Sequence, residues 1–214
     1  MNETSRKIVF WEVDTQADFM LPGGKLYVPG AEKIIPNLKR LVQAARDGRV
    51  LLISDACRHS VNDPEFKQFP PHCIRGTPGA DIIPEGLART VETIPNDATF
   101  QLPKNVLECQ QIVLEKQTLD VFDNPHASAV VERLGNNVEY IVFGVVTEYC
   151  VQLAAKGLLD RGKKVALVKD TIETLKSEDG RRALDELKAR GVELITANEA
   201  LARLGNGSAR KPLR

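Results

Sequence analysis

Three side chains of this sequence could together perform covalent acyl transfer, because they supply a nucleophile, a carboxylate and an ammonium group. Cys150 lies just beyond a predicted strand, at the start of a predicted helix, and Asp14 and Lys116 stand at the ends of two other predicted strands. The unpaired N–H groups and the dipole of a helix start favour negative charge, which would lower the pKa of the Cys150 thiol. A thiol nucleophile splits one difficult step into two easier ones, and a neighbouring carboxylate can carry the proton. Each residue alone could be structural, but charged groups at a buried sheet edge are costly unless they pair or function.

Apolar segments suited to buried strands alternate with segments whose apolar residues recur at the spacing of a helix. This alternation predicts an α/β fold: a doubly wound, mostly parallel six-stranded sheet with helices on both faces, a three-layer sandwich. Ligands of such folds bind outside the carboxyl ends of the strands, so Asp14, Lys116 and Cys150 are expected to meet there. The predicted strands are 7–14, 50–53, 111–115, 140–143, 164–168 and 193–196, and the predicted helices are 31–46, 127–134, 148–161, 177–190 and 198–204.

The composition is that of one domain without a charge surplus. The chain has 214 residues, 43% of them hydrophobic, which suits a single domain spanning 1–214 with a frayed tail at about 205–214. Lys and Arg total 29 and Asp and Glu total 29, so no net charge favours binding to nucleic acid. No segment approaches the roughly 20 apolar residues that span a bilayer, and no targeting segment is visible, so we expect no membrane partner and a cytoplasmic location.

Ordered motifs at the predicted strand ends resemble those of a known family. The segment DTQADF at 14–19, Lys116 and the segment GVVTEYCV at 144–151 are similar to the motifs of the isochorismatase-like cysteine hydrolases. Within that superfamily, PPHCIRGTPGA at 70–80 is most similar to nicotinamidases. The similarity extends over roughly residues 7 to 200, and the family commonly forms homo-oligomers, so we expect a homo-oligomer here too.

The resemblance implies a role for each of the three chemical residues. Cys150 would attack the carboxamide carbon, Asp14 would carry the thiol proton to the departing ammonia and later activate water, and Lys116 would orient Asp14 and favour the thiolate. The family also has a cis peptide at the position of Val145 and Val146. The backbone N–H groups of Val146 and Cys150 are therefore the candidate oxyanion donors.

Two residues of the first motif are candidates for contact with the substrate. Phe19 lies where the family places an aromatic wall of the pocket, although a phenylalanine could also be part of the core. Gln16 could contact the substrate, or it could hold the loop after the first strand by hydrogen bonds to the backbone, as Asp18 could.

The resemblance also implies a divalent metal, usually zinc, that binds the pyridine nitrogen of the substrate, but the ligand motif is altered here. The family has an Asp-x-His pair after the second strand and a further histidine. Alignment on His59 puts Cys57 in the aspartate position, whereas alignment on Asp55 puts Cys57 in the histidine position. Either alignment makes Cys57 a ligand, with His59 and His72 beside it or with Asp55, and thiolate and imidazole suit zinc. Loss of the metal, as in relatives that act without one, is the alternative.

The expected function is hydrolysis of nicotinamide to nicotinate and ammonia through a thioester. An alternative is a related amidase that acts on a carbamoyl, ureide or other small amide without a metal. A third possibility is a non-catalytic binding or assembly module with the same fold, but the presence of Asp14, Lys116 and Cys150 argues against it.

Overall fold

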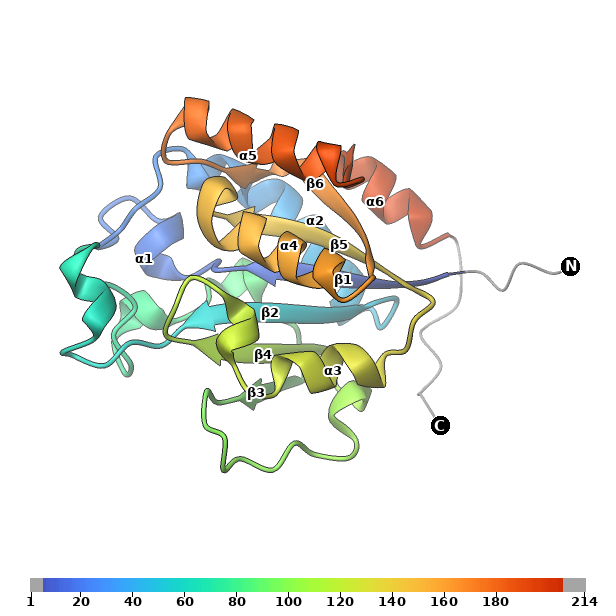
Figure 1. Cartoon of the computed structure of the whole chain (residues 1–214), viewed down its shortest axis with the longest axis horizontal. Coiled ribbons are helices and arrows are strands. Elements are labelled where there is room, and N and C mark those ends of the chain that lie inside the picture. Colours follow the sequence, from blue (N-terminus) through green and yellow to red (C-terminus); the bar gives the residue numbers. More distant parts are fainter. Residues whose placement is uncertain (1–5, 206–214) are drawn as a thin grey trace, which may run out of the picture.

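The sheet of this protein has seven parallel strands, one more than predicted. The computed structural model describes residues 6–205, and its strands stand in the order β3-β4-β2-β1-β5-β6-β7 (Figure 1). Each neighbouring pair is parallel, so the carboxyl ends of all these strands lie at one edge. The predicted doubly wound α/β fold is confirmed. The strands are β1 (Lys7–Val13), β2 (Leu51–Cys57), β3 (Val91–Ile94), β4 (Gln111–Lys116), β5 (Val138–Val145), β6 (Lys164–Glu173) and β7 (Glu193–Ile195).

The additional strand is β3, at the edge of the sheet. It has only four residues, pairs only with β4, and buries only Ile94 fully. A short edge strand needs no continuous apolar run, so its sequence pattern is close to that of a loop. The second strand is also predicted too short, because the residues directly after 53 are polar and the strand is expected to end there. In the structure β2 continues to Cys57, since its buried polar side chains have hydrogen-bond partners; the Ser54 hydroxyl, for example, donates to Glu12.

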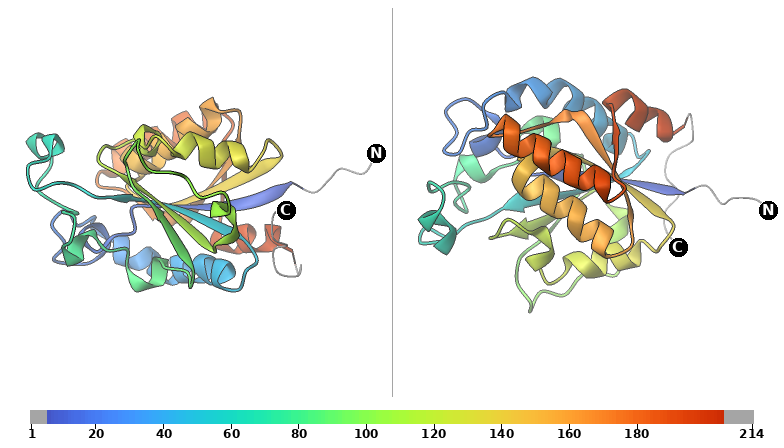
Figure 2. Two further views of the ribbon diagram at one scale, coloured as in Figure 1. Left: turned by 90° about the horizontal axis from the view of Figure 1, so that it is seen from below. Right: turned by 45° about the horizontal axis from the view of Figure 1, so that its top comes forward.

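Helices cover both faces of the sheet (Figure 2). One hydrophobic cluster joins the sheet to α2 (Ile35–Arg46) and α6 (Ala197–Arg203), and a second joins its other face to α3 (Ala127–Arg133), α4 (Gln152–Asp160) and α5 (Ser177–Ala189). The predicted three layers are therefore present. The predicted helix 31–46 begins with a 3₁₀ turn at Ala31–Ile34, and the first regular turn of α2 accommodates a proline, which lacks the N–H that this turn leaves unpaired.

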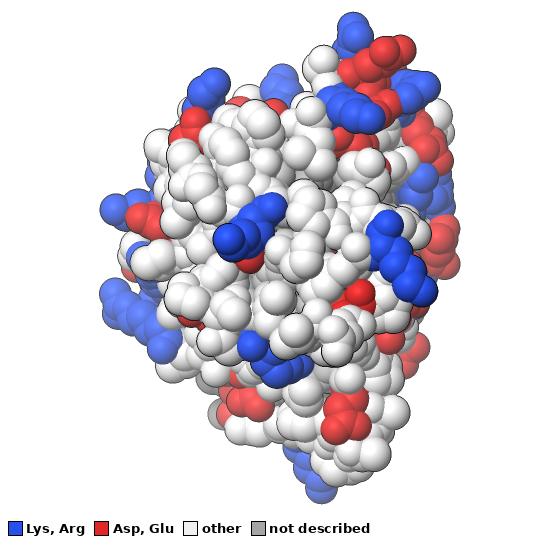
Figure 3. All heavy atoms as spheres, turned by 90° about the vertical axis from the view of Figure 1, so that its left-hand side faces the viewer, with Lys and Arg blue, Asp and Glu red and all other residues white. Residues whose placement is uncertain are grey.

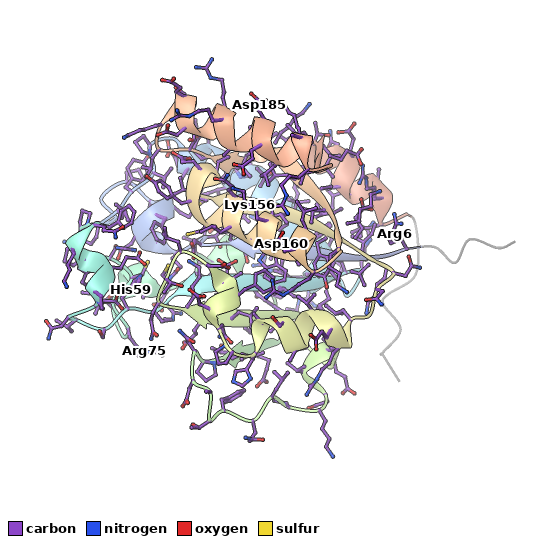
Figure 4. The ribbon with its side chains drawn as sticks, viewed as in Figure 1. Arg6, His59, Arg75, Lys156, Asp160 and Asp185 are labelled. Carbon is purple, nitrogen blue, oxygen red and sulfur yellow. The ribbon has the colours of Figure 1, made fainter. Side chains whose placement is uncertain are left out.

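The carboxyl edge of the sheet is extended by long connections. A short helix, α1 (Ala17–Met20), follows β1, and the segment after β2 contains only 3₁₀ turns, at Pro64–Lys67, Pro78–Ala80 and Pro84–Gly86. Arg75, labelled in Figure 4, ties this segment to β4 with its Nη2 2.7 Å from Oε2 of Glu115. The segment between β2 and β3 is thus held against the sheet although it contains no long helix or strand.

A buried carboxyl group beneath this edge should make stability depend on pH. Glu12 of β1 accepts hydrogen bonds from the hydroxyls of Thr15 at 2.7 Å and Ser54 at 2.6 Å, and it is fully buried. Burial raises the pKa of Glu12 to about 7. Its folded pKa therefore lies above its unfolded value of 4.5, so the stability it contributes is complete below pH 4.5 and is lost as pH rises through 7.

We expect this loss to amount to about 3 kcal/mol in the free energy of unfolding. Glu12→Gln keeps the shape of the neutral acid but does not ionise, so its free energy of unfolding should not show this loss between pH 4.5 and pH 8. Urea denaturation of both proteins at the two pH values would measure the difference. Equal declines in the wild type and the variant would contradict the prediction.

Within residues 6–205, no helix is long and apolar enough to cross a membrane. The tail expected to be frayed, 205–214, lies outside the described residues except for Gly205.

Candidate active site

The structure brings Asp14, Lys116 and Cys150 together at the carboxyl edge of the sheet. Asp14 directly follows β1, Lys116 is the last residue of β4, and Cys150 lies five residues after the end of β5. Lys116 Nζ lies 2.9 Å from Asp14 Oδ2 and 3.4 Å from Cys150 Sγ. All three side chains are buried, with 1%, 0% and 7% of each residue exposed. The Lys116 ammonium group therefore contacts both the Asp14 carboxylate and the Cys150 thiol.

The backbone around Asp14 is unusual in two places. Asp14 itself has φ of 47°, a left-handed conformation that non-glycine residues rarely adopt. Beside it, Gly144 of β5 has φ of 122°, and a Cβ there would lie 2.1 Å from the carbonyl oxygen of Val13. Only glycine lets β5 approach the end of β1 this closely. Residues held in sparsely populated conformations cluster at functional sites, which fits the position of Asp14.

Cys150 does not lie in the regular helix predicted for 148–161. Thr147–Val151 forms a π-type turn in which Tyr149 has non-helical angles, φ −123° and ψ −105°, and α4 begins at Gln152. The peptide bond between Val145 and Val146 is cis, as the family resemblance implied. Cys150 therefore stands in an irregular turn, where its side chain shares the pocket with Asp14 and Val146.

Burial, not the helix start, dominates the ionisation of this site. It raises the pKa of the Cys150 thiol well above its usual value, and the neighbouring Asp14 charge raises it further, while Lys116 opposes both. The expectation of a lowered thiol pKa is therefore wrong. Desolvation lowers the pKa of Lys116, but the charge of Asp14, together with the ionisable groups of Cys150, Cys57 and Asp55, outweighs this effect, so the pKa is raised. Burial and the Asp14 charge therefore disfavour the Cys150 thiolate, and the Lys116 ammonium group favours it.

The pocket around these groups is mostly apolar. Phe19, predicted as an aromatic wall, lies in it and packs edge-on against His72 with ring centroids 5.2 Å apart. The surface over this edge of the sheet is largely uncharged, with charged side chains scattered across it (Figure 3). Such a site suits a small neutral ligand. The other side chains around the pocket are Leu26, Cys57, Glu65, Phe69, Leu119, Val145, Tyr149 and Leu175.

Gln16 is placed behind the pocket lining. Its amide nitrogen donates to the carbonyl oxygens of Cys57 at 2.8 Å and Ala80 at 2.6 Å, and its amide oxygen accepts from the Cys57 N–H at 2.7 Å. These contacts favour the scaffolding role that the sequence left open, with Cys57 as the residue held in place. Asp18 has a similar position, since it accepts from the N–H groups of Cys73 at 2.7 Å and Lys25 at 3.0 Å.

Cys57, His59 and His72 form a buried group whose ligand atoms all lie within 4.8 Å of one another. His59, labelled in Figure 4, follows the carboxyl end of β2. Among the described residues, neither ring nitrogen of His59 makes a hydrogen bond, although Nδ1 lies 3.1 Å from Asp63 Oδ2. Nδ1–H of His72 donates to the Pro70 carbonyl at 2.8 Å, which leaves Nε2 as a lone-pair donor.

This group fits a divalent metal. Buried imidazole nitrogens and a nearby thiol are a suitable donor set for zinc. Asp55 is not part of the group; its Oδ2 accepts from Trp11 Nε1 at 2.9 Å. The alignment on His59 therefore describes the arrangement, with Cys57 in the aspartate position.

Sequence reasoning missed Glu65, which stands next to both histidines. Its Oε1 lies 3.8 Å from Nε2 of His59 and 3.7 Å from Nε2 of His72, and it also lines the pocket. Burial raises the pKa of Glu65. The Glu65 carboxylate would therefore lie beside a divalent metal held by these histidines and would add negative charge there. The loop carries no periodic pattern that would identify it.

Cys57 connects the metal-ligand group to the three catalytic candidates. Lys116 Nζ lies 3.1 Å from Cys57 Sγ, and the Cys57 thiol lies 3.6 Å from Asp14 Oδ1. Burial raises the pKa of this thiol as well. Lys116 therefore contacts two sulfur atoms and one carboxylate, so the two groups of residues form one continuous polar site.

Comparison with known proteins gives consistent matches over most of the chain. A family model described as isochorismatase domain matches residues 9–199. A nicotinamidase/pyrazinamidase of Mycobacterium tuberculosis is 24% identical over 192 residues, covering 87% of this chain and 97% of the relative. A nicotinamidase of Saccharomyces cerevisiae is 26% identical over 213 residues, covering 86% and 96%. The crystal structure of a pyrazinamidase of Pyrococcus horikoshii in complex with zinc is 27% identical, with a TM-score of 0.71 over 89% of this chain and 99% of that one.

Proposed function

The chain belongs to the isochorismatase family as an enzyme that hydrolyses amides, and we propose that its substrate is nicotinamide, which it converts to nicotinate and ammonia. The observation that carries the proposal is the contact of Lys116 Nζ with Asp14 and Cys150, two residues that line a mostly apolar pocket together with Cys57 and His72. The mostly apolar lining of the pocket suits a neutral aromatic amide, and relatives named nicotinamidases match over most of the chain.

In the first half of the reaction, Asp14 takes the proton of the Cys150 thiol as the sulfur attacks the carboxamide carbon. Because the pKa of the thiol is raised, this proton must be removed during attack, which requires a base in contact with the site. The N–H groups of Val146 and Cys150 are the proposed donors to the oxyanion. Asp14 then gives the proton to the amide nitrogen, the C–N bond breaks, and ammonia leaves a thioester on Cys150.

In the second half, water attacks the thioester carbon while Asp14 takes one of its protons. The C–S bond breaks and the proton returns to the sulfur, so the thiol is restored and the product leaves as the carboxylic acid, which gives up its remaining proton to solvent and becomes nicotinate. Lys116 stays protonated throughout because its pKa is raised. Its contact with Asp14 at 2.9 Å keeps the carboxylate directed at the reacting groups.

Cys57, His59 and His72 would hold a divalent metal, with Glu65 beside them. When bound, the metal would supply a site for the pyridine nitrogen and so orient the ring. The carboxamide would then lie toward Cys150 and Asp14, since Cys57 is in contact with Lys116.

We expect purified protein to retain about one zinc ion per chain after dialysis against zinc and then buffer. Loss of one ligand should weaken zinc binding at least about 100-fold, because neighbouring groups alone can change metal affinity by up to that factor. Cys57→Ser and His72→Ala should therefore lose the metal, as measured by elemental analysis. His126→Ala is the matched control, since its Nε2 contacts the Asp97 carbonyl instead. Equal zinc content in all variants would contradict the assignment.

Ammonia release from a panel of small amides tests the substrate. Nicotinamide should be hydrolysed, with nicotinate as the second product. If nicotinamide is inert while a carbamoyl compound or a ureide is hydrolysed, the substrate assignment fails and amide hydrolysis stands. If no amide yields ammonia with zinc-loaded protein, the proposed function fails. The homo-oligomeric state and the cytoplasmic location expected from the sequence remain predictions.

A further inference from the structure

Glu148 makes an unusual set of contacts two residues before the nucleophile. One carboxylate oxygen, Oε1, accepts from the backbone N–H groups of Leu175 at 3.0 Å and Lys176 at 2.9 Å. The other, Oε2, accepts from the hydroxyl of Thr174 at 2.5 Å. These three residues form the connection between β6 and α5, which lies at the carboxyl edge of the sheet (Figure 1). One side chain thus ties the turn that carries Cys150 to a separate loop.

The adjacent residues strengthen this connection. The Thr147 hydroxyl donates to the carbonyl oxygen of Glu173 at 2.7 Å. Helix α5 has no side-chain cap at its first residues, so Glu148 supplies negative charge where a helix start favours it. A Cβ on Gly180 would lie 2.5 Å from Thr174 Oγ1, so glycine is needed for α5 to pack this closely on the loop.

The loop that Glu148 holds contributes one side chain to the catalytic pocket. Leu175 lines the pocket with Tyr149 and Cys150, and it packs partly buried against the core. Glu148 is not among the residues that line this pocket, and its carboxylate is occupied by the loop. It therefore acts at a distance from the reacting atoms.

We propose that Glu148 is a positioning residue that holds Leu175 in the wall of the pocket, and that Leu175 restricts the substrate to small planar carboxamides. This role rests on the proposed amide hydrolysis and accounts for the selectivity of the enzyme for small planar amides. A wall that contacts the ring in the ground state and in the transition state equally contributes to KM and not to kcat.

Kinetics of Glu148→Ala and Leu175→Ala test the proposal, with nicotinamide and 5-methylnicotinamide as substrates. Each variant should raise KM for nicotinamide by about 5-fold to 30-fold with kcat nearly unchanged, because one apolar contact is lost. The ratio of kcat/KM values should shift about tenfold toward the methylated amide. Because both substitutions remove the same contact, the double variant should be no worse than either single one.

Glu148→Gln retains an oxygen acceptor and should recover part of the nicotinamide affinity. Glu178→Ala is the matched control, since Glu178 is exposed in the first turn of α5 and should behave as wild type. A fall in kcat for both substrates with unchanged KM, or additive effects in the double variant, would show a merely structural role and overturn the proposal.

Hydrogen exchange provides a measurement that does not depend on turnover. The amides of Leu175 and Lys176 should exchange at least about tenfold faster in Glu148→Ala than in wild type, because they lose their acceptor. Unchanged exchange would refute the anchoring role even if amides are hydrolysed. If the wild type hydrolyses no amide, the proposed function and the selectivity fail together, while the exchange result still decides whether Glu148 anchors the loop.

Discussion

Cys150→Ala should release ammonia from nicotinamide at least about 10⁴-fold more slowly than the wild type, because removal of a catalytic nucleophile has effects of this size or larger. Neither charged neighbour can replace the sulfur: Lys116 is held as an ammonium group by its raised pKa, and Asp14 is paired with it at 2.9 Å. The variant should remain folded, since Cys150 contributes only a small side chain to the core.

Cys109→Ala is the matched control for this experiment. Cys109 is a half-buried thiol whose sulfur lies 3.1 Å from the carbonyl oxygens of Val106 and Gln111, and it does not line the pocket. Its substitution should leave turnover close to wild type. Mass spectrometry of quenched wild-type enzyme should also detect the acyl group on Cys150. If Cys150→Ala keeps more than about a hundredth of the activity, the nucleophile is another group, and the neighbouring thiol of Cys57 would be tested next.

Lys116→Met should lower the free energy of unfolding by about 3 to 5 kcal/mol, as removal of one partner from a buried ion pair does. Lys116 is fully buried and pairs with Asp14, which is 1% exposed. Without the ammonium group, the carboxylate would be left in the protein interior without its counter-charge. Urea denaturation at pH 7 would measure the loss, and ammonia release should disappear with it.

The double variant Asp14→Asn/Lys116→Met separates the lost ion pair from lost packing. Removal of both charges should recover much of the stability, although not the activity, because no buried charge remains unpaired. Lys188→Met is the control: Lys188 pairs with Asp185 at 3.2 Å on the exposed surface of α5, with both side chains at least half exposed. That substitution should cost less than about 1 kcal/mol. A loss of similar size in the double variant and in Lys116→Met would contradict the proposed role of the ion pair.

The contact of Cys57 with Lys116 bears on both experiments. Because its sulfur lies 3.1 Å from Lys116 Nζ, a metal on Cys57 would add positive charge next to the catalytic ammonium group. Zinc-loaded and zinc-free preparations should therefore be compared separately in each assay. The Cys150 and Lys116 experiments then report on the three catalytic candidates under a defined metal content.

The meeting of Asp14, Lys116 and Cys150 at one edge of the sheet is the part of the candidate site that the sequence predicted well. Asp14, Lys116 and the turn before Cys150 follow long apolar strands, and in a parallel sheet the ends of neighbouring strands meet at one edge. The order of the strands places β1 between β2 and β5, which brings these ends together. Local pattern and sheet geometry are enough for that inference.

Features that depend on partners distant in the sequence could not be obtained in this way. β3 is a strand only because β4 pairs with it, and Glu65 is near His59 and His72 only because the loop folds back over the pocket. Gln16 was ambiguous because its role depends on the backbone of Cys57 and Ala80, far along the chain.

The pKa of Cys150 shows most clearly the difference between features that are local in the sequence and features that depend on distant residues. The doubly wound α/β fold, the strand ends and the residues able to do chemistry follow from the sequence, because apolar periodicity and residue type are local properties. The irregular turn at Cys150, the burial that raises the pKa of its thiol and the contact of Cys57 with Lys116 become visible only in the folded chain. Desolvation and through-space contacts arise from the packed arrangement of the whole chain, so they have no local signature in the sequence.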